Sequence, residues 1–342
     1  MPAEWEPHAA TWIAWPHNPT DWPGKLSAIY WVYADITKKL AASEPVNILV
    51  NSSLHERRAR SVLQRSNVPL DRVTFHRIRT DRAWIRDFGP LFVLRETKRK
   101  RAAIARFRFN GWARYEGWHD DDAVPVKIAR ALGLPLLPAS RGRGFVLEGG
   151  SIDVNGCGTL LTTEECLLDQ DKQARNPGTD QATVERILKN ALGVTNMLWL
   201  RSGIVGDDTH GHVDDFCRFV APGRVAIAHE NISKDANYAA LHQNWERLQG
   251  FRLENGQKLD VIPLPMPSPA YYNGMRLPAS YANFYIGNRV VLVPTFNDTR
   301  DPMALGILGE LFPDRQVVGV HALDLLWGLG GIHCITMQQP KA

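Results

Sequence analysis

The chain has 342 residues, of which 44% are hydrophobic and 22% are charged. This balance is typical of a folded globular protein and excludes a disordered or fibrous chain. The formal net charge is only +4, and no uninterrupted apolar run reaches the roughly 18 residues that a membrane-spanning helix needs, so neither a nucleic acid nor a membrane is an expected partner.

Hydrophobic periodicity predicts an alternation of helices with strand pairs along the chain. In chain order the patterns predict a helix at 26–42, a strand at 46–50, a helix at 54–64, strands at 73–78, 91–94 and 103–109, a helix at 123–132, a strand at 159–163, a helix at 181–192, strands at 197–200 and 225–229, a helix at 236–248, a strand at 290–294, a helix at 303–312 and a strand at 316–320. No linker rich in Pro, Gly or Ser divides this alternation, so we predict a single α/β domain over residues 1–342.

The N-terminus and the cysteines indicate the cellular compartment in which the protein is expected. The first eight residues carry acids and prolines where a signal peptide has a basic start and an apolar stretch. The four cysteines are widely spaced and form no CxxC pair; they are Cys157, Cys166, Cys217 and Cys334. Such a pattern is typical of proteins in a reducing compartment. We therefore expect a cytoplasmic protein. The basic run at 98–101 predicts a solvated hairpin tip, because no aromatic residue interleaves it.

Four segments combine polar residues with glycine in apolar surroundings. Burying a polar group there costs free energy, so such residues are candidates for a functional site. The segments are WIRDFGP at 84–90, EGG at 148–150, DDTHGHVDD at 207–215 and GGIHCIT at 330–336. Each borders a predicted strand. Because loops at strand ends are held by a rigid scaffold, we expect the four segments to converge on one pocket.

Cys334 is the strongest candidate for a nucleophile. Its neighbours Ile332 and Ile335 are typical of a cysteine packed in a core. However, Gly330 and Gly331 permit a close backbone approach and unusual dihedral angles, which a core strand does not require.

The segment around His212 leaves two interpretations open. In an extended segment His210, His212 and Asp214 share one face, so they could form the metal site of a metallohydrolase. Alternatively, His212 is a general acid or base beside a carboxylate that holds a cationic substrate. The second is favoured, and no metal is expected, because Asp215 stands where a dinuclear hydrolase would have another histidine.

Two further carboxylates are candidate site residues. Asp87 and Arg86 would point to opposite faces of a strand, so Asp87 should have another partner. Glu148 precedes two glycines and fits either a turn or a site. A thiol, an imidazole and several carboxylates suit a planar guanidinium cation better than acyl transfer, which needs oxyanion donors.

These four segments resemble the motifs of the agmatine deiminase and bacterial peptidylarginine deiminase family, within the guanidine-modifying enzymes. The similarity extends to 1–24, 109–112 and 281–285, and so covers nearly the whole chain. It implies a five-bladed, pseudo-symmetric α/β propeller of ββαβ-type units with a central site. Three positions beside the nucleophile differ from the family pattern: Leu329 for glycine, Gly331 for asparagine and Met337 for glutamine.

The resemblance also implies the roles of the site residues. Cys334 attacks the guanidinium carbon and forms a covalent amidino-cysteine, and His212 transfers protons. Asp87 and Asp214 hold the guanidinium, Glu148 completes the polar ring, and no cofactor takes part. We expect the carboxylates to raise the pKa of the Cys334 thiol in the empty site, and the substrate cation to lower it.

The family divides between agmatine and arginine as substrates. Without a signal peptide or an adhesion-like domain, agmatine is favoured, giving N-carbamoylputrescine and ammonia in polyamine biosynthesis. Peptidylarginine, free arginine and a non-catalytic guanidine binder are the alternatives. We expect Trp84, Trp112 and Glu116 to line the pocket, and Arg114 or Arg218 in its wall would contradict agmatine. A homodimer is also expected.

Overall fold

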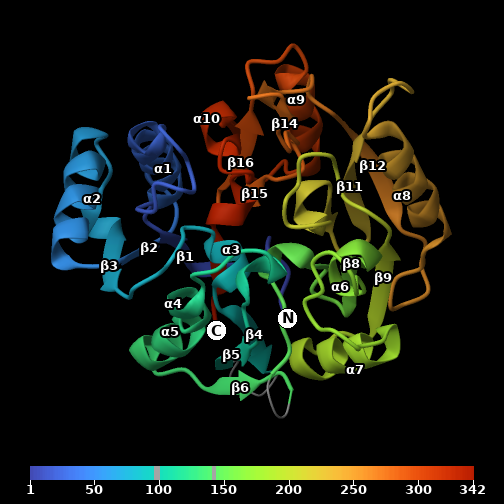
Figure 1. Cartoon of the computed structure of the whole chain (residues 1–342), viewed down its shortest axis with the longest axis horizontal. Helices are drawn as coiled ribbons and strands as arrows, with labels where there is room; N and C mark the ends of the chain where they lie inside the picture. The colour runs from blue at the N-terminus through green and yellow to red at the C-terminus, as the bar shows by residue number, and fades with distance from the viewer. Residues whose placement is uncertain (96–100, 141–143) are drawn as a thin grey trace.

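The computed structural model describes residues 1–95, 101–140 and 144–342. In this part of the chain the strands form five sheets of three or four strands and one two-stranded hairpin, with helices around them (Figure 1). The first sheet joins both ends of the chain in the order β18-β1-β2-β3. Its strands are β1 (His8–Ala14), β2 (Val46–Val50), β3 (Val73–Arg77) and β18 (Met337–Pro340).

Four further sheets share one plan, in which an antiparallel pair is followed by a helical segment and a parallel third strand. They are β4 (Leu91–Arg95), β5 (Arg101–Arg106) and β6 (Leu136–Pro138); β7 (Asp153–Val154), β8 (Thr159–Thr163) and β9 (Asn196–Leu200); β10 (Cys217–Ala221), β11 (Arg224–His229) and β12 (Asp260–Pro265); and β15 (Tyr285–Ile286), β16 (Val290–Thr295) and β17 (Gln316–His321). The hairpin pairs β13 (Tyr271–Tyr272) with β14 (Met275–Arg276). The fold is therefore mixed α/β.

The long helices lie at the periphery of Figure 1, while both chain ends and the short helix α3 lie near its middle. The helices are α1 (Leu26–Ala41), α2 (Ser53–Arg65), α3 (Ile85–Phe88), α4 (His119–Asp122), α5 (Val124–Leu132), α6 (Glu164–Leu167), α7 (Gln181–Leu192), α8 (Tyr238–Gly250), α9 (Asp301–Leu311) and α10 (Leu323–Leu326). Local signals set several ends: Asp180 caps the start of α7, and Gly193 ends it in a left-handed conformation.

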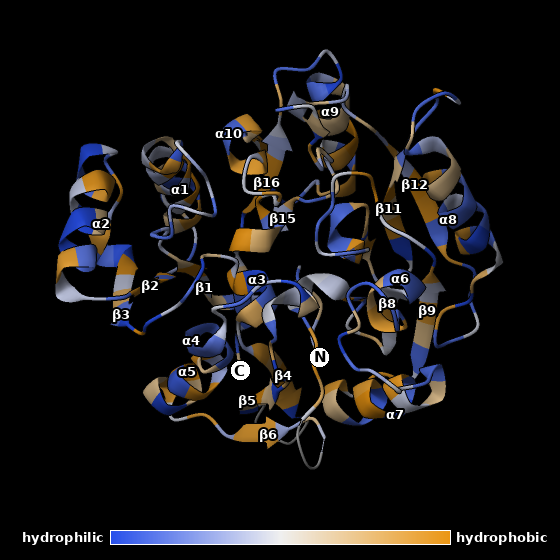
Figure 2. Cartoon of the chain, viewed as in Figure 1, coloured by the Kyte–Doolittle hydropathy of each residue, from blue (hydrophilic) through white to orange (hydrophobic). Residues whose placement is uncertain are grey.

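Burial explains why the strands and helices pack in this way. In Figure 2 the outer helices α2 and α7 carry both hydrophilic and hydrophobic residues, as amphipathic helices do. The parallel strand β2 (VNILV) is apolar almost throughout, and its Ile48 and Val50 are fully buried. Trp12 of β1 is fully buried as well.

The predicted helices and strands are all found, with ends shifted by a few residues. The predicted basic hairpin joins β4 to β5, which pair antiparallel, but residues 98–100 lie outside the described residues. Within the described ranges, no helix is both long enough and apolar enough to cross a bilayer.

Several strands were not predicted, and each carries a misleading local signal. The strand β10 contains Arg218, which is fully buried in ion pairs. The strand β12 contains Pro263 and Pro265, which normally argue against a strand. The edge strand β18 is short and polar, and it pairs with β1 from the far end of the chain.

Candidate active site

The four polar segments lie on short helical turns that meet at one place. Asp87 lies on α3, Glu148 directly precedes the 3-10 turn η3 (Gly149–Ser151), Asp214 lies on η4 (Val213–Asp215), and Cys334 lies on η5 (His333–Ile335). The turn α3 contacts both η3 and η5, and η3 contacts η4. The predicted convergence of the four segments is therefore confirmed.

Asp87 faces the centre of this cluster, whereas the guanidinium of Arg86 donates to Glu4 and Gln338. Oδ2 of Asp87 accepts a hydrogen bond from Nε1 of Trp112 at 2.9 Å, and Oδ1 accepts one from the backbone N–H of Gly150 at 3.0 Å. Burial is the main cause that raises the pKa of Asp87 to about 7, with His212 opposing and Asp214 adding to the shift.

Two glycines leave the space in which these side chains meet. A Cβ at Gly150 would lie 2.6 Å from Nδ1 of His212, 2.8 Å from Oδ1 of Asp87 and 3.0 Å from Oδ1 of Asp214. A Cβ at Gly149 would lie 2.1 Å from the carbonyl oxygen of Arg86. The glycines after Glu148 are thus required by close approach.

His212 is buried between carboxylates. Its Nδ1 lies 3.6 Å from Oδ1 of Asp87, and its Nε2 lies 3.6 Å from Oε2 of Glu148. Burial by itself lowers the pKa of His212, but the charge of Asp87 and the contacts with Cys166 and Glu148 outweigh burial and raise this pKa well above its ordinary value. His212 therefore holds a proton that it can donate.

Glu148 points into the cluster and is not merely a turn residue. Its Oε1 lies 3.2 Å from Nε of Arg175, and both side chains are fully buried. Burial would raise the pKa of Glu148, but the positive charges of Arg175 and His212 hold it below its ordinary value. Glu148 is thus an ionised carboxylate beside His212.

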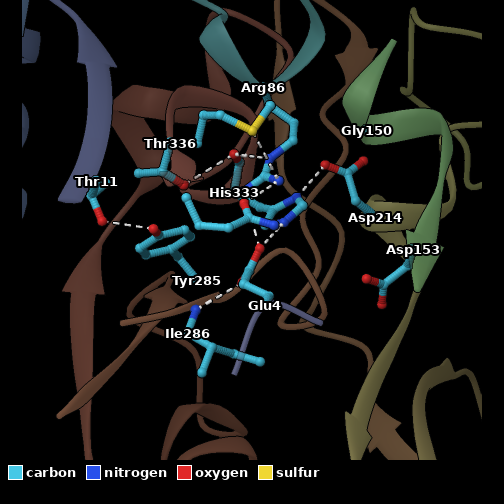
Figure 3. A network of polar contacts seen from close by, with 12 residues as sticks. Glu4, Thr11, Arg86, Gly150, Asp153, Asp214, Tyr285, Ile286, His333 and Thr336 are labelled. Carbon is cyan, nitrogen blue, oxygen red and sulfur yellow. Dashed lines mark hydrogen bonds and ion pairs between the residues drawn. The ribbon is translucent and has the colours of Figure 1, made fainter. Parts of the chain in front are cut away.

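Asp214 is linked through His333 to the N-terminal segment (Figure 3). Nδ1 of His333 lies 2.6 Å from Oδ2 of Asp214, and Nε2 lies 2.7 Å from Oε2 of Glu4. Burial would raise the pKa of Asp214, but its hydrogen bond to His333 and the charge there lower it. Glu4 also pairs with Arg86 and Arg218, each at 3.0 Å.

The thiol of Cys334 is buried beside these acids, with its Sγ 3.9 Å from Oδ2 of Asp214. Burial is the main cause that raises the pKa of Cys334 well above its ordinary value, followed by the charges of Asp214, Asp215 and Asp87. The direction of this shift is the one expected from the neighbouring carboxylates, although burial contributes more.

A cavity of about 760 Å³ opens onto Cys334 and Asp87. Its wall includes the aromatic residues Trp84, Trp112 and Tyr115, together with the acids Asp21 and Asp208. The predicted lining by Trp84 and Trp112 is therefore confirmed. Glu148, His212 and Asp214 are not among the lining residues. His212 and Asp214 lie behind the wall, against Asp87 and Cys334 respectively, and Glu148 lies against His212.

Other expectations about the cavity wall need correction. Glu116 is exposed and is not a lining residue. Arg114 and Arg218 do not line the cavity either: the first is exposed, and the second is fully buried with Glu4 and Asp153. An arginine that the sequence did not suggest, Arg82, does line it, and Asp21 neutralises its charge at 2.5 Å.

The backbone before Cys334 also differs from expectation. Gly330 and Gly331 allow neighbouring side chains to come close to the backbone. A Cβ at Gly330 would lie 2.5 Å from the Trp84 ring, and a Cβ at Gly331 would lie 2.3 Å from Oδ1 of Asn283. The unusual dihedral angle instead belongs to Leu329, with a φ of 65°. A leucine at this φ carries backbone strain of about 1 kcal/mol, which a glycine would avoid.

The metal set proposed for a metallohydrolase does not form. The segment is not extended: His210 has a φ of 64°, and its Nε2 lies 3.2 Å from Asp169, away from His212 and Asp214. Within the described residues, two other groups bring three ligand atoms within 4.8 Å, namely Glu148, Cys166 and His212, and Asp214, Asp215 and Cys334.

Sequence reasoning missed the residues that support the site. His333 lies beside Cys334 in the sequence, and its ring could have been recognised as a polar group in an apolar segment. Glu4, Arg175 and Arg218 had no local signal, because their partners lie far away along the chain.

The comparisons with known proteins agree with this geometry. The model of the Porphyromonas-type peptidyl-arginine deiminase family matches residues 1–340. An agmatine deiminase of Pseudomonas aeruginosa is 39% identical over 363 aligned positions, which cover 99% of this chain and 95% of the relative.

Solved structures are similar over the same extent. The agmatine deiminase of Enterococcus faecalis superimposes with a TM-score of 0.90 at 33% identity, covering 100% of this chain and 95% of that one. The agmatine deiminase of C. jejuni with substrate bound gives a TM-score of 0.86 at 28% identity, covering 99% and 96%. This chain therefore belongs to the Porphyromonas-type peptidyl-arginine deiminase family.

Proposed function

We propose that this protein is a cysteine-dependent hydrolase of guanidinium groups, which converts agmatine and water into N-carbamoylputrescine and ammonia. The observation that carries the proposal is a buried thiol, Cys334, that lines a cavity with Asp87 and with acidic and aromatic walls, while Asp214 lies directly behind the thiol. The similar proteins from P. aeruginosa, E. faecalis and C. jejuni are agmatine deiminases, which supports the choice of substrate.

Binding begins with the two aspartates. A guanidinium is planar and presents paired N–H groups, which carboxylates accept. Oδ1 of Asp214 is buried behind the cavity wall and has no hydrogen-bond partner within the described residues, so it can accept an N–H of a guanidinium that enters beside Cys334. Glu148 contributes indirectly, because it pairs with His212.

Substrate binding also prepares the nucleophile. In the empty site the acids keep Cys334 a thiol, whereas a bound guanidinium compensates their charge and favours the thiolate. The thiol proton is released to water. The substrate therefore helps to ionise the group that attacks it.

The reaction then proceeds in two displacements. The sulfur lone pair of Cys334 attacks the guanidinium carbon, His212 protonates one nitrogen, and its C–N bond breaks to release ammonia. Water next attacks the amidino carbon of the thioether, and His212 takes the proton of this water. The C–S bond breaks and the remaining hydroxyl proton is lost to water, which returns the thiolate and leaves the neutral carbamoyl product.

The far end of the cavity favours an ammonium group over a carboxylate. Oδ2 of Asp21 is buried and has no hydrogen-bond partner in the described part of the chain. Asp208 lines the same cavity and accepts a hydrogen bond from Tyr115 at 2.6 Å. Arg82 lines this cavity too, but its ion pair with Asp21 weakens the attraction that it could offer to an α-carboxylate.

Replacing Asp208 by Asn should raise the KM for agmatine about tenfold, because a charge-assisted contact with the ammonium is lost. The matched measurement uses n-butylguanidine, which lacks the ammonium group, and its KM should barely change. An equal loss for both compounds would mean that Asp208 does not contact the ammonium.

The pH dependence should report Asp87. Its pKa is raised to about 7 in the free protein, so the ionised form that binds a cation predominates above this pH and is lost as the pH falls. We expect kcat/KM for agmatine to drop about tenfold for each pH unit below that value. Asp87→Asn should lose this acidic limb, and an unchanged limb would assign the titration to another group.

The proposed function is tested by measuring ammonia and ureido-product formation with agmatine, free arginine and a peptidyl arginine. Agmatine should have the highest kcat/KM. Equal or faster reaction of either arginine substrate would overturn the choice of agmatine, and no ammonia from any of them would overturn the hydrolase. Iodoacetamide should inhibit, whereas EDTA should not, as a thiol mechanism requires.

The five sheets also support a finer description of the fold. We infer that they are the blades of a pseudo-symmetric propeller, since four share one strand plan and the first contains the same plan with β3 added, and the proposed site lies on turns between them. A single domain over residues 1–342, a homodimer, and a cytoplasmic role in polyamine biosynthesis stay predictions.

A further inference from the structure

The side-chain amide of Asn283 contacts the sulfur of Cys334. Nδ2 of Asn283 lies 3.3 Å from Sγ, and the backbone N–H of Gly331 lies 3.4 Å from the same atom. Asn283 is only 2% exposed, so water does not compete strongly for this donor. Two N–H donors therefore face one buried sulfur.

The orientation of this amide is fixed by its neighbours. Oδ1 of Asn283 accepts the backbone N–H of His333 at 2.9 Å, and Nδ2 donates to Oδ1 of Asp215 at 2.9 Å. The second N–H of Nδ2 is shared between Sγ of Cys334 and the backbone oxygen of Asp214, each 3.3 Å away. With the amide reversed, its NH2 group would face the N–H of His333, which offers no acceptor. The donor is therefore the group that points toward Sγ.

We propose that Asn283 is a catalytic residue, whose amide N–H, together with the backbone N–H of Gly331, stabilises the thiolate of Cys334 for attack on the guanidinium carbon. This inference rests on the proposed function. A thiolate beside the carboxylate of Asp214, 3.9 Å away, is destabilised by like charge, and N–H donors offset this repulsion.

The same amide also suits the thiol form. Oδ1 of Asn283 lies 3.6 Å from Sγ and can accept the S–H hydrogen, while Nδ2 donates once that hydrogen has left. Because both atoms belong to one rigid amide, the site accommodates ionisation without moving a side chain. A preorganised donor of this kind favours the charged state at no cost of rearrangement.

Gly331 allows Asn283 to occupy this position. A Cβ at residue 331 would lie 2.3 Å from Oδ1 and 2.8 Å from Cγ of Asn283. The amide is held by several hydrogen bonds and cannot yield easily, so a side chain at this position would displace it from the sulfur.

The test measures how fast iodoacetamide alkylates Cys334 at pH 8, with the exposed Cys157 as an internal reference in the same mass spectra. The rate follows the thiolate fraction. We expect Asn283→Ala to slow the alkylation of Cys334 at least about tenfold, with an unchanged rate at Cys157. The kcat for agmatine should fall by a similar or larger factor, while KM changes less than about threefold, since the aspartates are retained.

Two further variants separate catalysis from packing. Asn283→Asp keeps the acceptor for His333 but replaces the donor that faces Sγ by an oxygen, so it should slow alkylation at least as much as Asn283→Ala. Gly331→Ala keeps the amide but displaces it, and should also slow alkylation. A purely structural role would lower the melting temperature of these variants but leave the alkylation rate of Cys334 unchanged in those that stay folded.

The controls are a buried asparagine and an unhindered glycine elsewhere. Asn244 is fully buried and makes two hydrogen bonds of 2.8 Å, so Asn244→Ala should lower the melting temperature without slowing Cys334. Gly309→Ala, where nothing lies within 4 Å of an added Cβ, should change neither.

Unchanged alkylation of Cys334 in Asn283→Ala and Asn283→Asp, with both folded, would overturn the proposal. If Asn283→Ala unfolds, the alkylation rate of Cys334 in Gly331→Ala tests the proposal instead, and an unchanged rate there would overturn it. Alkylation does not depend on turnover. A wild-type protein that releases no ammonia would therefore refute the proposed function while the alkylation rates still report on Asn283.

Discussion

Replacing Cys334 by Ala should reduce ammonia release from agmatine to less than about one thousandth of the wild-type rate. The variant lacks the only cysteine, among the described residues, that lines the cavity beside Asp87, so no covalent intermediate can form. Guanidine binding should persist, because the carboxylates remain. Agmatine should still raise the melting temperature of the variant.

The matched control is Cys217→Ala. Cys217 is fully buried in a separate hydrophobic cluster, so its loss should change stability alone. Cys166 is less suitable, because its sulfur lies 3.9 Å from Oε2 of Glu148. Residual activity of Cys334→Ala above about 5% would contradict the nucleophile, as would a trapped mass adduct on another cysteine peptide of the wild-type protein.

The alternation of helices and strands was predictable because it depends on local periodicity. Parallel strands such as β2 and β16 are buried on both faces and read as short apolar runs. The strands that escaped prediction depend on distant partners instead. The strand β18 pairs with β1 across almost the entire chain, and no local pattern reports that contact.

The site was predictable to the extent that its chemistry is concentrated in short segments with glycine. Asp87, Glu148, His212, Asp214 and Cys334 all meet as expected. The turns they lie on were less predictable. An extended backbone would have placed His210 beside His212, but the left-handed conformation at His210 turns its ring toward Asp169.

The supporting ion pairs could not be read from the sequence. The hydrogen bond from His333 to Glu4 joins residues 329 positions apart. An arginine such as Arg218 within an apolar strand looks like an exception until its partners Glu4 and Asp153 are known. A buried charge is stable only with a partner, and that partner is a property of the fold.

The second large effect concerns the aspartates that are proposed to hold the guanidinium. Asp87→Asn and Asp214→Asn should each lower kcat/KM for agmatine roughly a hundredfold, which corresponds to a loss of about 3 kcal/mol of transition-state stabilisation. Both carboxylates already accept N–H groups: Trp112 and Gly150 donate to Asp87, and His333 lies against Asp214. An amide would turn an NH2 group toward one of these donors or toward the substrate, and an NH2 group cannot accept their hydrogen bonds. The variants therefore lose a hydrogen bond as well as the negative charge.

The double variant distinguishes a shared function from two independent ones. Both aspartates face the same small space, since an added Cβ at Gly150 would lie 2.8 Å from Oδ1 of Asp87 and 3.0 Å from Oδ1 of Asp214. Once one contact to a single planar cation is lost, the other no longer acts on a correctly placed carbon, so the losses should not add. We expect the double variant to lose far less than the sum of the two single effects. Fully additive losses would mean that the aspartates act on different groups, and near-normal kcat/KM in either single variant would place the guanidinium elsewhere.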